Sequence, residues 1–92
     1  MAMRYSARMP ARQTLPLLWL LSDARNDAGL ERALAVLPHG SGFVFRHYHL
    51  APEARRDRFD VLARMARNCD HRVILAGNVQ DWAAWGADGV YG

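Results

Sequence analysis

Lysine is absent from this 92-residue sequence, so all 12 of its basic side chains are arginines. The formal net charge of +3 is mild, and Arg4, Arg8 and Arg12 precede the first acidic residue, Asp23. A basic arm of this kind can touch nucleic acid or anionic lipid, but chain ends are more often loosely solvated. We therefore expect residues 1–14 to form a flexible basic tail, and we expect neither nucleic acid nor a membrane as a partner.

Cysteine and long apolar runs are also scarce. The single cysteine, Cys69, excludes an internal disulfide and fits a reducing cytoplasm. The apolar run Leu15–Leu21 follows the arginines as in a secretory leader, but Pro16 interrupts it and Ser22–Arg25 is a poor cleavage site. No run approaches the ~20 apolar residues of a membrane-spanning helix. These features predict a cytoplasmic protein.

Short apolar runs separated by helix-like stretches are what the sequence does contain. The four runs are Leu15–Leu21, Phe43–Phe45, Val73–Ala76 and Gly89–Tyr91. Such continuous runs are typical of strands buried on both faces of a parallel sheet. They predict one α/β domain over residues 15–92, ordered β-α-β-α-β-α-β with a parallel sheet. Either an open doubly wound sheet or a segment of a (β/α) barrel fits this order.

Three helices are predicted from apolar spacing and end signals. The first begins near Asn26 or Asp27, either of which can cap it, and ends at Pro38. The second begins at Pro52, and five of its arginines mostly lie on a face that we expect to be solvated. The third covers about residues 79–85, with Asn78 as its cap. The predicted apolar positions are Leu30, Ala33, Leu34 and Leu37 in the first helix, and Phe59, Leu62, Ala63 and Ala66 in the second.

Polar residues follow the second predicted strand in the densest functional cluster, Arg46–His49. An arginine offers a planar fork of donors that suits phosphate or carboxylate. Side chains alternate along a strand, so Arg46 and Tyr48 are predicted to point one way and His47 and His49 the other. The alternative is structural: Arg46 pairs with a strand-end acid such as Asp23, and the histidines only finish a loop. Asp23 in turn either orients Arg46 or caps the turn after it.

The sequence carries no strong metal or catalytic signature. His47 and His49 form an H-x-H pair on a strand, but without a third ligand nearby the pair predicts no metal site, and one cysteine makes no zinc site. His39 and His71 are interpreted as structural. No G-x-G-x-x-G follows the first predicted strand, so nothing supports dinucleotide binding. We name no catalytic residue.

Three stretches in register resemble thiamine phosphate synthases and their TenI-type relatives. Leu18–Asp23 is similar to the family's first strand, L-Y-L-I-T-D, and Phe45–Tyr48 falls where the family has L-R-E-K. Gly86–Tyr91 is similar to its G-A-D-G-V-H stretch. The order and spacing agree over residues 17–92. The resemblance implies the N-terminal half of a (β/α)8 TIM barrel.

The resemblance also implies an activity, which is a transferase step in thiamine biosynthesis. The family joins hydroxymethylpyrimidine pyrophosphate to thiazole phosphate with Mg²⁺. By this resemblance Arg46 binds the pyrophosphate, and Tyr48 and Asn78 are further candidates for substrate binding. Electrostatic stabilisation of a departing diphosphate by a guanidinium agrees with this role.

At several positions the sequence departs from the family pattern, and these departures bear on the expected activity and on Mg²⁺ binding. Tyr48 stands where the family has lysine, and Ala76–Asn78 contains no acid where the family has an Asn-Asp pair with a magnesium ligand. The later ligands belong to the C-terminal half, so we expect a truncated, inactive half-barrel that does not retain Mg²⁺ binding as the family does. Four strands would leave two unpaired edges, so the expected partner is a second copy or a complementary half-barrel. The alternative function is a non-catalytic α/β module that binds a phosphorylated ligand or a protein.

Overall fold

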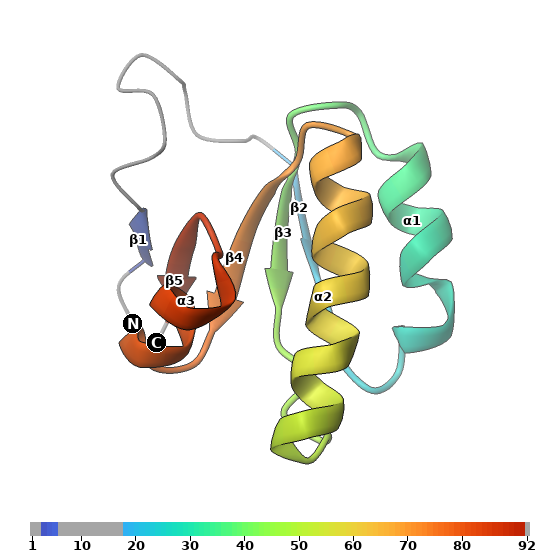
Figure 1. The fold of residues 1–92 in the computed structure, drawn as a ribbon. Helices are drawn as coiled ribbons and strands as arrows, with labels where there is room; N and C mark the ends of the chain where they lie inside the picture. Colours follow the sequence, from blue (N-terminus) through green and yellow to red (C-terminus); the bar gives the residue numbers. More distant parts are fainter. Residues whose placement is uncertain (1–2, 6–17, 92) are drawn as a thin grey trace.

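A five-stranded sheet forms the centre of the protein in the computed structural model, which describes residues 3–5 and 18–91 (Figure 1). The strand order is β1-β5-β4-β3-β2. Strands β2 to β5 run parallel, and β1 pairs with β5 in the antiparallel direction. The strands are β1 (Met3–Tyr5), β2 (Trp19–Leu21), β3 (Gly42–Phe45), β4 (Arg72–Ala76) and β5 (Gly89–Tyr91). The predicted parallel α/β architecture is therefore confirmed.

The two faces of the sheet carry separate apolar clusters, because successive side chains of a strand point in opposite directions. On one face Phe43, Phe45, Val73 and Leu75 pack together with buried side chains of the helices. On the other face Trp19 packs against Val44, Ile74 and Ala76, and no described helix contributes to this smaller cluster. The helices thus cover one face, whereas a doubly wound sheet has helices on both.

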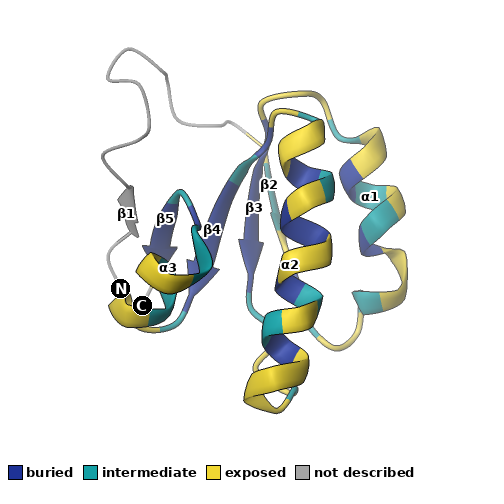
Figure 2. Cartoon of the chain, in the orientation of Figure 1, coloured by how far each residue is buried: buried dark blue, intermediate teal, exposed yellow. Residues whose placement is uncertain are grey.

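Three α-helices cover that face, and α1 and α2 bury residues of the apolar stripes predicted for them, whereas α3 has no fully buried residue (Figure 2). They are α1 (Leu30–Val36), α2 (Pro52–Asn68) and α3 (Val79–Trp85). Leu30 and Leu34 of α1 and all four predicted apolar positions of α2 are buried. Pro52 occupies the first turn of α2, where its missing N–H costs no hydrogen bond. None of the helices in the described part of the chain has the length and apolar character to cross a bilayer.

The start of the first helix differs from the prediction. A short 3₁₀ helix, η1 (Asp27–Gly29), precedes α1; Asn26 makes no side-chain capping bond to η1, and the N-cap of α1 is Gly29, which has no side chain. The Asn26 amide instead donates to the carbonyl oxygen of Leu21, and its Oδ1 accepts from the Asp23 N–H. The capping prediction was wrong here because the side chain of Asn26 is engaged by the end of β2.

The edge of the sheet beside β5 also differs from expectation, because β1 pairs there. The register joins Met3 to Tyr91 and Tyr5 to Gly89. Residues 3–5 fall within the segment predicted to be a flexible tail, and the rest of residues 1–14 lie outside the described residues. Of the two edges expected to be unpaired, the structure covers one. Among the described residues β2 pairs with β3 alone.

Candidate functional site

A concavity of about 450 Å³ lies on the face of the sheet opposite the helices and reaches the carboxyl ends of β2 to β5. Trp19 forms one wall. Its ring lies over Gly42, where an added Cβ would come within 2.3 Å of the ring atoms. Glycine at this position therefore lets the indole lie flat across β3. The described residues that line the concavity are Trp19, Leu21, Val44, Arg46, Tyr48, Ala76 and Tyr91.

Arg46 and Tyr48 both line this concavity, as the alternation argument predicts. Strand β3 itself ends at Phe45, one residue before them. Within residues 18–91 the guanidinium of Arg46 forms no salt bridge and no hydrogen bond, so its five donors are directed to no described acceptor. Tyr48 is 61% exposed. The carboxyl edge of the sheet thus presents a guanidinium, unpaired among the residues that the structure describes, next to a phenol.

His47 points to the other face and is fully buried. Its ring stacks on Phe45 with the centroids 4.7 Å apart and approaches His49 at 4.9 Å. Its Nδ1 lies 2.8 Å from Ser22 Oγ, and its Nε2 pairs with Asp27 Oδ1. The backbone of His47 has a φ of 34°, in the left-handed region that favours glycine. Both ring nitrogens are therefore occupied, and His47 is not free to serve as a metal ligand.

Asp27 links His47 to helix α2. Its Oδ1 also accepts from Nε of Arg58 at 2.8 Å, and the same guanidinium donates two bonds to the carboxylate of Glu31, at 2.6 and 2.8 Å. Hydrogen bonds from His47 and then Arg58 hold the pKa of Asp27 below its ordinary value. The bonds from Arg58 do the same for the pKa of Glu31. This ion cluster fastens η1 and α1 to α2 underneath the site.

Asp23 does not orient Arg46. Its Oδ1 accepts from the N–H groups of Arg25 and Asn26, at 2.8 and 3.1 Å, which is the turn-capping alternative. These bonds, with the Arg25 side chain, keep the pKa of Asp23 below its ordinary value despite the opposing effect of desolvation. The N–H of Arg46 is instead held by Ser22 Oγ at 2.7 Å.

Arg55 is one of the five arginines of α2 that were expected to lie mostly on the solvated face, and for this residue the expectation was wrong. The residue is only 9% exposed. Its Nε and Nη2 donate to the carbonyl oxygen of Arg46 at 3.2 and 3.0 Å, and Nη2 also donates to the carbonyl of Ala76. The signal that locates it is spacing, because Arg55 lies four residues before Phe59 and so continues the apolar stripe by one turn.

Asn78 lies apart from the other predicted substrate ligands. Its Oδ1 accepts from the N–H of Asp81 at 2.7 Å and caps α3, and Asn78 is not among the residues lining the concavity.

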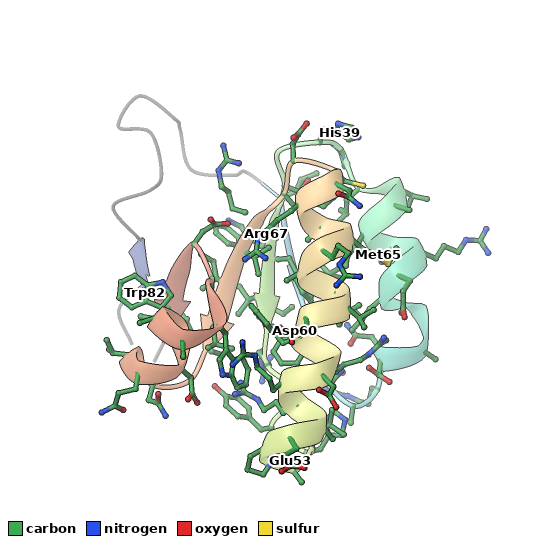
Figure 3. All side chains as sticks on the ribbon, in the orientation of Figure 1. His39, Glu53, Asp60, Met65, Arg67 and Trp82 are labelled. Atoms are coloured by element: carbon green, nitrogen blue, oxygen red, sulfur yellow. The ribbon has the colours of Figure 1, made fainter. Side chains whose placement is uncertain are left out.

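The histidines His39 and His71 lie away from the concavity. His39 lies at the opposite end of the strands, far from Glu53 in the first turn of α2 (Figure 3). His71 is buried and bonds the carbonyl of Leu34 at 2.8 Å. The position of His71 agrees with the structural interpretation, whereas the side chain of His39 is exposed and lies 3.5 Å from Asp70.

The donor set of the concavity does not suit magnesium. Mg²⁺ takes oxygen ligands, usually one or two carboxylates together with phosphate oxygens. The described lining contributes phenols, a guanidinium and apolar groups but no carboxylate. In the described part of the chain, no cluster of three histidine, cysteine or acidic side chains is arranged to hold a metal. We therefore derive no chemical step through a metal.

Comparison of the chain with protein-family models, with curated proteins and with solved structures found no match.

Proposed function

We propose that this protein binds a phosphorylated small molecule at the carboxyl edge of its parallel sheet, in the manner of a thiamine phosphate synthase. The observation that carries the proposal is the guanidinium of Arg46, which lines the concavity and has no acidic partner among residues 18–91. An arginine fork matches the oxygens of a phosphate in two parallel hydrogen bonds. The apolar walls formed by Trp19, Leu21 and Tyr91 suit a flat ring attached to that phosphate.

The proposed ligand is hydroxymethylpyrimidine pyrophosphate, on the strength of the resemblance at Leu18–Asp23, Phe45–Tyr48 and Gly86–Tyr91. Arg46 would grip the pyrophosphate, and the hydroxyl of Tyr48 could donate a further hydrogen bond to it. Sequential parallel strands with all the described helices on one face are also what half of a (β/α)8 barrel would present (Figure 1). A reducing cytoplasm, which suits the free thiol of Cys69, is the compartment we propose.

We propose further that the chain does not catalyse the condensation alone. In a complete barrel the concave face is closed by the remaining strands, and here the outer edge of β2 pairs with no described strand. A second copy of the chain or a complementary half-barrel would close that face. Light scattering at micromolar concentration tests this part of the proposal, and a stable monomer in the absence of any partner would contradict self-association.

A non-catalytic binding module is the second candidate, and the lining of the concavity favours it. Among the described lining residues no carboxylate, imidazole or thiol is present to transfer a proton. Both the synthase-like protein and the binding module would bind the phosphorylated ligand, but only the synthase-like protein, completed by its partner half, would convert it to product. A protein that binds the pyrimidine pyrophosphate but forms no thiamine phosphate, even with its partner half present, would support the module.

Isothermal titration calorimetry with hydroxymethylpyrimidine pyrophosphate, with and without Mg²⁺, tests the binding step. We expect the wild-type chain to bind and Arg46→Ala to lose about tenfold or more in affinity, because a charged hydrogen bond to phosphate is lost. Arg32→Ala removes the same charge from an exposed position on α1 and serves as the matched control. Absence of binding by the wild-type chain would overturn the proposal.

A further inference from the structure

Two arginines of α2, one turn apart, sit in opposite electrostatic surroundings. Arg58 bonds the carboxylates of Asp27 and Glu31, which neutralise it and raise its pKa. Arg55 is more deeply buried, yet within residues 18–91 it forms no salt bridge. Asp81 is close enough to favour its charged form without pairing with it. A buried cation without a counter-ion is costly, since desolvation opposes the charge.

What surrounds Arg55 stabilises its charge without cancelling it. The carbonyl oxygens of Arg46 and Ala76 accept from Nε and Nη2 at the ends of β3 and β4. The centre of the guanidinium lies 5.4 Å from the rings of Phe45 and Tyr48 and 5.3 Å from that of Trp85. Carbonyl dipoles and aromatic faces attract a cation, but they carry no net negative charge. Desolvation lowers the pKa of Arg55 from an ordinary value so high that the group stays charged at neutral pH.

This charge lies directly behind the concavity. Arg46, Tyr48 and Ala76 all line the concavity, and each of the three is in contact with Arg55. Nη1 of Arg55 makes none of the described hydrogen bonds. This nitrogen lies beside Gly77, and a Cβ added to Gly77 would lie 3.7 Å from it. Glycine at position 77 therefore places no side chain against Nη1.

We propose that Arg55 is a second anion-recognition residue of this site, whose charge, with that of Arg46, attracts the pyrophosphate end of the ligand. The inference rests on the proposed function and extends it to a residue that the family resemblance does not include. A buried guanidinium fixed by two strand ends is pre-organised, so little side-chain entropy is lost when the anion binds. Low local polarity also strengthens its attraction for the anion.

The test uses inorganic pyrophosphate as the probe and calorimetry as the readout. Arg55→Gln removes the charge and keeps a hydrogen-bonding side chain, and Arg55→Lys keeps the charge. Arg64→Gln is the matched control, because it makes the same change at an exposed position of the same helix. We expect Arg55→Gln to weaken binding by about tenfold, while Arg64→Gln binds like the wild type. Arg55→Lys should recover most of the affinity even if it unfolds at a lower temperature, a rescue that a purely structural role would not produce.

A second measurement needs no variant and covers the case in which Arg55→Gln fails to fold. In the wild-type chain carrying ¹⁵N-labelled arginine, pyrophosphate should shift the side-chain resonances of Arg46 and Arg55 and leave those of the neutralised Arg58 in place. Unchanged Arg55 resonances, or an Arg55→Gln variant that binds like Arg64→Gln, would overturn this inference and leave the proposed function standing. A wild-type chain that does not bind pyrophosphate would overturn both.

Discussion

The imidazole of His47 is paired through Nε2 with the carboxylate of Asp27, 20 residues earlier in the chain. Its other nitrogen meets Ser22 Oγ, which also accepts the N–H of Arg46. If Ser22 donates its own proton to Nδ1, the Nε2–H is left for the carboxylate, and this tautomer satisfies every group. A chain of hydrogen bonds therefore runs from the carboxylate of Asp27 through the ring of His47 to the hydroxyl of Ser22. The same hydroxyl holds the backbone N–H of Arg46, the residue proposed to bind phosphate.

Acid should weaken this arrangement. The pKa of Asp27 and that of Glu31 are lowered in the folded state from ordinary values of 3.8 and 4.5. Their contribution to stability is therefore complete above those ordinary values and is lost as pH falls through the lowered ones. We expect the free energy of unfolding in urea to fall below about pH 4.5 on account of these two groups.

Asp27→Asn is the variant that isolates this contribution. It should cost about 1 kcal/mol at pH 7, a modest value because the carboxylate is 41% exposed and solvent screens it. The difference from wild type should shrink as pH falls below 3.8 and through the lowered pKa of the Asp27 carboxyl in the folded state. Asp60→Asn, at an exposed ion pair on α2, is the control and should change little. A difference between wild type and Asp27→Asn that stays constant down to pH 3 would contradict the role of its charge.

Gly42 should resist replacement even by alanine. The added Cβ would stand 2.3 Å from the Trp19 ring, so the indole must move off β3 and into the concavity. We expect Gly42→Ala to cost about 1–3 kcal/mol, as overpacking does, and to change the tryptophan near-ultraviolet circular dichroism. Gly29→Ala meets no atom within 4 Å and should be nearly neutral. An unchanged spectrum for Gly42→Ala would show that the indole does not lie over β3.

The strands and helices were predictable because burial controls their sequences. Strand β4 contains the whole predicted run Val73–Ala76, helix α3 matches its predicted range, and α2 begins at the predicted proline. In each of these elements a local pattern, either a continuous apolar run or helical spacing, agrees with the tertiary packing. The strand β1 carries no such pattern, since its position depends on pairing with β5 across most of the chain length.

The site was predictable only in part, because its geometry depends on long-range partners. The alternation of side chains along a strand was sufficient to place Arg46 and Tyr48 on the same side, and both line the concavity. It was not sufficient to reveal that Arg55 turns inward, since charged residues on a helix are usually solvated. The spacing of Arg55 from Phe59 places it on the buried stripe of α2. A buried position for an arginine can be recognised only if its acceptors are known, and these are the carbonyl oxygens of Arg46 and Ala76 at the ends of two strands.

The aromatic centre of the helix-covered face should be the most sensitive packing position. Phe59 is fully buried, and its ring meets those of Phe45 and Trp85 with centroids 5.3 Å away in each case. Phe59→Ala should cost about 3–5 kcal/mol in chemical denaturation, from lost burial and the cavity left behind. Val61→Ala, on the same helix but 48% exposed, should cost far less. Equal losses in the two variants would show that this core is not closely packed.

Asn78 allows a separation of its capping role from its predicted role in substrate binding. Because its Oδ1 accepts from the N–H of Asp81, Asn78→Ala should cost about 1 kcal/mol of stability. Asn78→Ser, which keeps a capping oxygen, should recover most of that loss. Since Asn78 does not line the concavity, neither variant should change the affinity for pyrophosphate measured by calorimetry. Weakened binding by both variants, at temperatures where both are folded, would instead restore Asn78 to the binding site.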